Sequence, residues 1–219
     1  QICEMVLAEN ASRTAEEKKL YLMFDQMYWS LTFGETVHHN PVALCPEMKA
    51  YTIFVDGISK SLAATGVRVG WALGPVNVIA KMRALLSHIG AWSPMAEQYA
   101  TAMFLNNEKA VADFNKSFKI KLEERLNYIY KAFTALKQKA YPVDIVAPQA
   151  AIYLTVKIDF KGYIFNGKKL VTQKDVSDFL LNEASLALVP FSCFGADKES
   201  PWYRMSIGTC KFEELDEMF

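Results

Sequence analysis

Three short apolar runs in the first half of the chain each stop abruptly at a polar residue or a glycine. They are YLMF at 21–24, YTIFV at 51–55 and VRVGWAL at 67–73. Runs of this length and composition are typical of strands that are buried on both faces of a sheet. The stretches with helical spacing of apolar residues lie at 2–18, 76–90 and 95–107. Strands that alternate with helices predict an α/β layer with a mostly parallel sheet.

The texture of the chain changes at the start of a long, charged amphipathic stretch. Apolar residues recur three or four positions apart through 109–140, which predicts one long helix connecting two lobes. Beyond it, 151–160 and 202–208 have the composition of strands, and 173–184 has that of a helix with Thr172 as its N-cap. This second half is therefore expected to be α+β.

The change of texture places a domain boundary near residue 112, with no flexible linker. The predicted units are residues 1–112, part of a large α/β domain, and residues 113–219, a small α+β domain that includes the long helix. The chain begins with Gln1 inside one helical pattern and ends at Phe219 inside another. We therefore expect it to be a fragment of a longer protein.

Composition narrows the classes of function. The counts of 24 basic and 24 acidic residues cancel, whereas a nucleic-acid surface normally has a basic excess. No apolar run is long enough to span a membrane, and the N-terminus lacks the layout of a signal peptide. The four cysteines are scattered without CxxC pairing, which is typical of reduced thiols. We expect a cytoplasmic protein with no nucleic-acid partner and no membrane segment.

Three charged residues stand where a sheet of this kind presents groups to a ligand. Asp25 ends the first apolar run, and ligands in open α/β sheets bind beyond the carboxyl ends of strands. Lys60 follows the second run after a short turn. Arg68 lies between Gly66 and Gly70, which permit close approach of the backbone. A carboxylate, a lysine and an arginine at one sheet edge suit a ligand with a cationic ring, an aldehyde and a phosphate.

These residues lie within motifs that resemble one enzyme family. GISKSLAATGVRVGW at 57–71 resembles the pyridoxal-phosphate lysine signature of the class I/II aminotransferases of fold type I, and FDQMY at 24–28 is similar to their strand-end D-x-x-Y element. WYRMSIG at 202–208 resembles their C-terminal R-x-S strand. The small-domain elements that precede that strand have counterparts in PQAAIYL at 148–154 and VPFSCFG at 189–195. The matches occur in the family's order across nearly the whole chain.

The resemblance implies a role for three residues around the ring of pyridoxal 5′-phosphate. Lys60 would form the Schiff base and later move the proton at the substrate Cα, which requires an amine that is neutral for part of the cycle. Asp25 would pair with the pyridine nitrogen and keep it protonated. Tyr28 would donate a hydrogen bond to the ring 3′-oxygen. Residues 1–112 would then be the C-terminal half of the cofactor-binding large domain.

The resemblance also implies a phosphate site and a substrate site. Ser59 and Arg68 would hold the cofactor phosphate, and Arg204 would bind the amino-acid carboxylate through its planar fork. Gly57 stands where many relatives have a serine, so the phosphate site loses one hydroxyl. No metal site is expected: the adjacent His38 and His39 point different ways, and no further ligand stands at suitable spacing.

The function implied for the full-length protein is transamination between an amino acid and a 2-oxo acid, carried out by a homodimer. The glycine-rich phosphate turn and the aromatic residue that stacks on the ring, which relatives carry upstream, have no counterpart in this chain. We therefore expect the 219-residue chain alone to be inactive and to retain no covalently attached cofactor.

Two other functions suit the same residues. A lyase, synthase or decarboxylase of the same fold would use Lys60, Asp25 and Arg204 equally well, because the cofactor chemistry is shared. A regulator could keep the lobe to sense the cofactor without turnover. The stretch 88–99 contains no arginine that could bind a second carboxylate of the amino donor. Trp92 in this stretch favours an apolar or aromatic donor.

Overall fold

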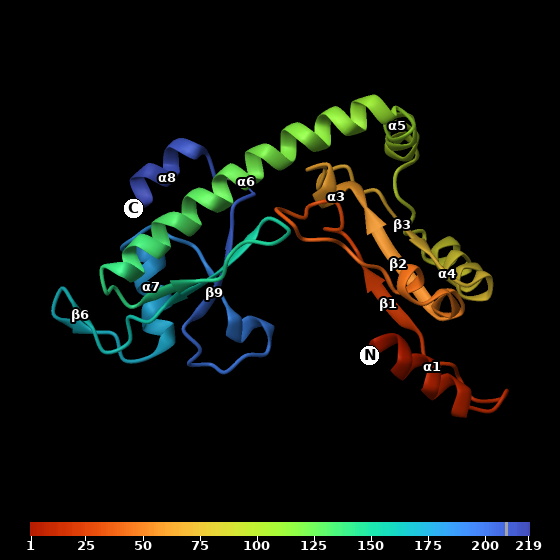
Figure 1. The fold of residues 1–219 in the computed structure, drawn as a ribbon, viewed down its shortest axis with the longest axis horizontal. Coiled ribbons are helices and arrows are strands. Elements are labelled where there is room, and N and C mark those ends of the chain that lie inside the picture. Colours follow the sequence, from red (N-terminus) through yellow and green to blue (C-terminus); the bar gives the residue numbers. More distant parts are fainter. Residues whose placement is uncertain (209) are drawn as a thin grey trace. The chain divides into compact units, whose positions relative to one another are not determined.

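The computed structural model describes residues 1–208 and 210–219 (Figure 1). It divides into two compact units, Gln1–Ser117 and Phe118–Phe219. The division falls within the long helix α6 (Glu108–Gln138), which matches the single helix predicted from the amphipathic spacing.

The first unit is built on a three-stranded sheet in which β2 (Thr52–Gly57) lies between β1 (Leu22–Asp25) and β3 (Gly70–Leu73). β1 runs parallel to β2, and β3 runs antiparallel to it. Each of the three apolar runs contains a strand, but the sheet has one parallel and one antiparallel pair. The loop between β2 and β3 brings the chain back at the end where β2 stops, with Gly57 paired to Gly70, so β3 must run in the opposite direction.

Helices and short turns complete the first unit. They are α1 (Ile2–Ser12), α2 (Pro41–Leu44), η1 (Pro46–Ala50), α3 (Ile58–Ser61), α4 (Val76–Ile89) and α5 (Met95–Leu105). The prediction of a helix to residue 18 is wrong, because the backbone of Arg13 is extended. The Glu17 carboxylate then accepts hydrogen bonds from the Thr14 amide at 2.7 Å and its hydroxyl at 3.0 Å, which closes a local turn in place of a helical one.

The second unit contains a four-stranded antiparallel sheet in the order β4-β5-β9-β8. Its strands are β4 (Val143–Ile145), β5 (Tyr153–Ile158), β8 (Val189–Pro190) and β9 (Trp202–Ser206). The other elements are the hairpin β6 (Ile164–Phe165) and β7 (Lys168–Lys169), the helices α7 (Gln173–Asn182) and α8 (Phe212–Met218), and the turn η2 (Phe191–Phe194). The arrangement is α+β.

The core of the second unit combines one face of α6 with one face of the sheet. Leu122, Leu126, Ile129 and Phe133 recur three or four residues apart on α6 and are buried. Along β5 every second residue is buried, as expected for a strand with one face on the core. Arg204 on β9 belongs to the opposite set, because its neighbours Tyr203 and Met205 occupy the buried positions.

Candidate functional site

The parallel pairing of β1 and β2 brings their carboxyl ends to one edge of the sheet. Asp25, the last residue of β1, is in register with Val55, and the next amide, of Gln26, donates to the Val55 carbonyl at 3.0 Å. Asp25 is exposed, and its Oδ1 accepts the Met27 amide at 3.1 Å. The edge expected from the sequence to bind a ligand therefore presents Asp25 beside the strand that leads to Lys60.

Lys60 lies in the single helical turn α3, which begins directly after β2. The turn is held by the Leu62 amide, which donates to the Ile58 carbonyl at 3.1 Å, and by the Ser61 hydroxyl, which donates to the Gly57 carbonyl at 3.1 Å. Lys60 is half-buried, and among the described residues no carboxylate forms an ion pair with its amine. Its amine is therefore available to a ligand.

Arg68 has an unusual backbone conformation for a residue with a long side chain. Its φ angle is 61°, in the left-handed region, where residues other than glycine are uncommon. Its Nη1 donates to the Thr65 carbonyl at 3.0 Å, and the residue is exposed. Strained backbone of this kind is concentrated at ligand sites, where the surrounding fold maintains it.

The backbone on either side of this loop approaches itself closely at Gly57 and Gly70. A Cβ atom built on Gly57 would lie 2.9 Å from the Gly70 Cα and 2.9 Å from the Val69 carbonyl oxygen. Both contacts are with backbone, so a side chain at position 57 would force the two strands apart. The serine expected there in relatives is therefore incompatible with the way β2 and β3 meet in this chain.

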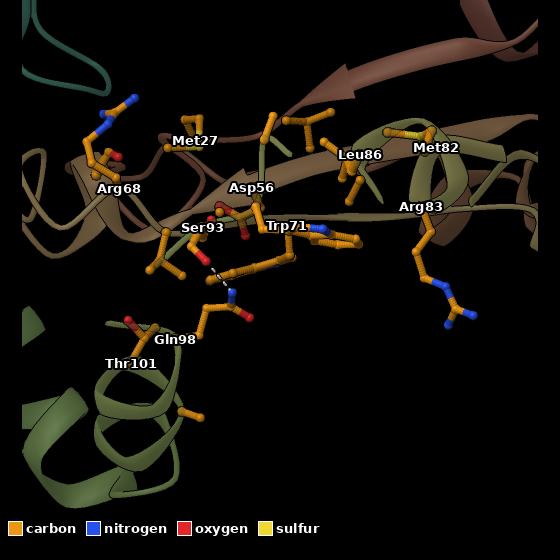
Figure 2. Close-up of a pocket in the computed structure, with 18 of the residues that line it drawn as sticks. Met27, Asp56, Arg68, Trp71, Met82, Arg83, Leu86, Ser93, Gln98 and Thr101 are labelled. Carbon is orange, nitrogen blue, oxygen red and sulfur yellow. Dashed lines mark hydrogen bonds between the residues drawn. The ribbon is translucent and has the colours of Figure 1, made fainter. Parts of the chain in front are cut away.

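A cavity of about 780 Å³ opens on this side of the first unit (Figure 2). Ser59 and Arg68 line it, together with apolar and aromatic side chains from β2, β3, α4 and α5. Figure 2 shows Arg68 and Arg83 at opposite ends of the view, with Asp56 and Trp71 between them. Arginine and serine are suitable ligands for a phosphate.

The cavity unites only part of the predicted site. Of the five predicted residues that lie in the first unit, Ser59 and Arg68 are in its lining, whereas Asp25, Tyr28 and Lys60 are not. Tyr28 is half-buried in the segment after β1, and its carbonyl accepts the Leu31 amide at 2.9 Å.

A further residue of this region, Asp56, is not among the residues predicted from the sequence. It is 7% exposed, and its carboxylate accepts three hydrogen bonds. The donors are the Gly57 amide at 2.7 Å, the Trp29 Nε1 at 3.1 Å and the Gln26 Nε2 at 3.4 Å. The sequence does indicate that Asp56 is buried, because this acid directly follows the apolar run 51–55, at a position that a strand could bury. From the sequence it reads only as part of a turn.

Arg204 lies in the second unit, and its surroundings are aromatic. It pairs with Thr155 across β5 and with Val189 across β8, so Tyr153 is its diagonal neighbour on the same face of the sheet. The Arg204 Cζ lies 4.5 Å from the centroid of the Tyr153 ring and 4.9 Å from that of Phe194. Both separations are within the range of cation–π attraction.

The hydrogen-bonding groups of Arg204 are not used up within the fold. Its buried Nε has no hydrogen-bond partner, and no carboxylate of the described residues forms an ion pair with it. Buried polar groups without partners are rare and call for an explanation. A guanidinium that lies against two rings and has no anion beside it is chemically suited to pair with a carboxylate.

The strand that carries Arg204 is anchored from its other face. The Tyr203 hydroxyl accepts a hydrogen bond from Gln173 Nε2 at 2.5 Å and lies 3.1 Å from the Ser177 hydroxyl. Burial raises the pKa of Tyr203, so the phenol stays neutral and keeps its hydrogen bonds across the physiological range. β9 is thereby tied to α7, which fixes the backbone of Arg204.

Residues 1–208 and 210–219 contain neither a metal-binding cluster nor a membrane-spanning helix. No group of three or more histidine, cysteine, aspartate and glutamate side chains in this part of the chain is placed to hold a metal ion. None of its helices combines the length and the apolarity that crossing a membrane requires.

Comparison with known proteins gives a consistent picture. The family profile described as "Aminotransferase class I and II" matches residues 9–219. The aspartate aminotransferase of Geobacillus stearothermophilus is 33% identical over 197 residues, which cover 84% of this chain and 47% of that protein. A probable aspartate/prephenate aminotransferase of Rickettsia prowazekii is 27% identical over 212 residues, covering 95% of this chain and 50% of that protein.

Solved structures agree at the level of the fold. The aspartate aminotransferase of Rhizobium meliloti superimposes with a TM-score of 0.78 at 28% identity, covering 91% of this chain and 48% of that one. The aromatic aminotransferase of Pyrococcus horikoshii gives a TM-score of 0.80 at 25% identity, covering 99% and 51%. The chain thus spans about half the length of the relatives it matches.

Proposed function

Because the chain belongs to the class I and II aminotransferase family, we propose that the full-length protein transfers the amino group of an amino acid to a 2-oxo acid. The observation that carries the proposal is the family match over residues 9–219, which includes Lys60 directly after a strand that is parallel to the one ending at Asp25. Family members depend on pyridoxal 5′-phosphate, which supplies an electron sink for cleavage of bonds at the substrate Cα.

Five residues of the first unit would hold this cofactor. Arg68 and Ser59, which line one cavity, would bind the phosphate, and the left-handed backbone of Arg68 is consistent with a residue held for a ligand. Asp25 would pair with the ring nitrogen, and Tyr28 with the ring 3′-oxygen. Lys60, whose amine has no carboxylate partner in the described residues, would attach to the cofactor aldehyde and carry the proton to and from the substrate Cα.

Arg204 would bind the α-carboxylate of the substrate. Its stacking between Tyr153 and Phe194 limits the rotation of the guanidinium plane, and the absence of a described carboxylate partner leaves the fork for the ligand. A bidentate pair would fix the direction of the carboxylate and with it the bond at Cα that breaks.

The remaining features of the full-length protein follow from the same family. We propose that β1 and β2 belong to a mostly parallel large-domain sheet, that the protein acts as a cytoplasmic homodimer, and that its substrates are an amino acid and a 2-oxo acid. The relatives named above are aspartate, aspartate/prephenate and aromatic aminotransferases, so acidic and aromatic donors are the first to test.

The test is covalent attachment at Lys60 in the full-length protein. Borohydride reduction of the cofactor-loaded protein should fix the label on the peptide containing Lys60, and Lys60→Ala should abolish both the label and amino transfer while leaving the fold intact. Lys81→Ala, a change of an exposed lysine on α4, should leave both unchanged. Label recovered on Lys81 or Lys49 would contradict the assignment.

A turnover assay on the same protein separates the competing functions. Formation of a 2-oxo acid from aspartate or phenylalanine, dependent on added 2-oxoglutarate, is the result expected of an aminotransferase. Product formation without an amino acceptor would indicate a lyase or decarboxylase instead. Cofactor attached at Lys60 with no turnover of any donor would indicate a sensor.

A further inference from the structure

Asp56 is a buried acid on β2 whose hydrogen-bond partners come from two different segments. Its Oδ1 accepts the Gly57 amide at 2.7 Å on its own strand. Its Oδ2 accepts the Trp29 Nε1 at 3.1 Å and the Gln26 Nε2 at 3.4 Å, both from the segment that follows β1. One carboxylate therefore joins the end of β2 to the chain beyond the end of β1.

A carboxylate at this depth is costly unless its charge is well solvated by the protein. Asp56 is 7% exposed, and no lysine, arginine or histidine of the described residues forms an ion pair with it. Burial of an ionised group is tolerated where hydrogen bonds replace those of water, and here three donors do so. Losing a donor leaves the anion under-solvated, so each of the three contacts helps to hold it.

The two side-chain donors bracket one of the predicted cofactor residues. Tyr28 lies between Gln26 and Trp29, and Asp25 directly precedes Gln26. On the other strand, Gly57 begins the turn that leads to Lys60. The Asp56 carboxylate thus links the segment that carries Asp25 and Tyr28 to the strand end that leads to Lys60. The backbone hydrogen bond from the Gln26 amide to the Val55 carbonyl joins the same two parts of the chain.

We propose that Asp56 is a positioning residue of the cofactor site: it holds the 25–29 segment against the end of β2, so that Tyr28 and Lys60 reach the same ring. The effect on the cofactor rests on the proposed function, whereas the hydrogen bonds of Asp56 to the 25–29 segment do not depend on it. Asp56 acts through Tyr28, and its contribution is to the placement of that hydroxyl group.

The link is tested first without cofactor, by hydrogen exchange on the full-length protein. Asp56→Ala should speed the exchange of the Trp29 and Leu31 amides, which close the turns after β1, by roughly tenfold, because the segment loses both of its side-chain hydrogen bonds to Asp56. The matched control is Asn10→Ala, which removes two buried hydrogen bonds to the Leu20 backbone elsewhere in the same unit. It should leave these two amides unchanged. Equal exchange in Asp56→Ala and the unmodified protein would overturn the link.

The consequence for the site is tested on the cofactor-loaded protein with a variant that leaves Asp56 itself in place. Gln26→Leu combined with Trp29→Phe removes both side-chain donors of the linked segment. Tyr28, if it donates a hydrogen bond to the ring 3′-oxygen as proposed, would stabilise negative charge there, so its displacement would favour the protonated form of the lysine-bound cofactor. The midpoint of the pH titration of the visible absorbance should rise by about one pH unit, and the cofactor dissociation constant by about tenfold.

The outcomes separate the inference from the proposed function. If the unmodified protein carries no cofactor on Lys60, the proposed function is wrong, and this is seen before any variant is compared. If Lys60 is labelled but the double variant titrates and binds cofactor like the unmodified protein, Asp56 has only a structural role and the inference is wrong. If Asp56→Ala does not fold, Trp29→Phe alone replaces it in the hydrogen-exchange comparison. Trp29 is 48% exposed, so this change should not prevent folding.

Discussion

Arg204 shows how a single residue can be held rigidly and yet be left without an anion. Two aromatic rings flank its guanidinium, and the core-facing Tyr203 next to it anchors the strand to α7. If it binds the substrate carboxylate, Arg204→Ala should weaken amino-acid binding by about 2–4 kcal/mol, as for the loss of one partner of a buried charge pair. Arg204→Lys should not restore binding, because an ammonium cannot reproduce the planar fork.

The measurement for Arg204 is the KM for the amino donor beside the dissociation constant of the cofactor, which should change little. Arg13→Ala is the control, since Arg13 pairs with Glu9 on an exposed surface. Release of cofactor with unchanged donor affinity would mean that Arg204 serves another part of the site.

A sequence motif predicts which residues form a site, but it does not predict burial that depends on strand pairing. The spacing of Asp25, Lys60 and Arg68 is local and is visible in the sequence. The burial of Asp56 depends on strand register, because the residue becomes enclosed only when β3 pairs with β2 and Trp29 folds back over it. The sequence motif alone shows neither the pairing of β3 with β2 nor the position of Trp29. The same holds for Gly57, whose lack of space for a side chain is set by Gly70 on another strand.

At the scale of elements, periodicity identified the longer helices, and strand-like composition identified β1, β2, β3, β5 and β9. The directions and ends of these elements depended on tertiary contacts. The long helix is recognisable because its apolar residues keep helical spacing over many turns. The antiparallel course of β3 was not predictable from an apolar run, which is the same read in either direction. The early end of α1 follows from the hydrogen bonds between Thr14 and Glu17.

The start of α7 supports a prediction for one element. Thr172 and Asp175 form a reciprocal capping box, with the Thr172 hydroxyl accepting the Asp175 amide at 3.2 Å and the Asp175 carboxylate accepting the Thr172 amide at 2.8 Å. Thr172→Ala should lower the free energy of unfolding by about 1 kcal/mol. Asp178→Asn, which breaks only an exposed pair with Lys174, should have a much smaller effect.

The capping box should also make stability depend on pH. Hydrogen bonds from the Thr172 amide and hydroxyl, and then from the Val171 amide, hold the pKa of Asp175 below its usual value of 3.8. A carboxyl whose pKa is lowered on folding stabilises the folded state above the unfolded pKa, and this stabilisation is lost as the pH falls through the folded pKa. The difference in urea midpoint between the unmodified protein and Asp175→Asn should therefore be full near neutral pH and shrink below about pH 4. A difference that stays constant down to about pH 2 would contradict this account.

At the scale of the whole molecule, two units built on different sheets were expected from the change of texture near the long helix. Which surfaces of these units remain uncovered was not predictable, because an amphipathic pattern shows that a helix has an apolar face without showing what covers it. In α4 no residue is buried, and in α5 only Thr101 is. Several apolar side chains of these two helices are exposed, such as Val76 and Met95, whereas others, such as Met82 and Leu86, are half-buried.

Helix α5 exposes a row of three large side chains, the α5 stripe, which consists of Met95, Tyr99 and Met103. These side chains stand four residues apart on one face of α5 and are 77%, 70% and 72% exposed. Exposed apolar side chains grouped on one face of a helix favour association with another apolar surface. We expect the 219-residue chain to associate with a second copy through this stripe, and its mass from light scattering to rise with concentration toward that of a dimer.

Replacement of two stripe residues, Tyr99→Lys with Met103→Lys, should restore a monomer without loss of helical signal, because both positions face outward. The control is Ile164→Lys, a change at a residue 70% exposed on the β6–β7 hairpin of the other unit, which should leave association unchanged. A chain that stays monomeric at every concentration would show that the α5 stripe does not drive self-association. Equal dispersal by Ile164→Lys would show that association is driven by net charge and general solubility, so that the α5 stripe has no special part in it.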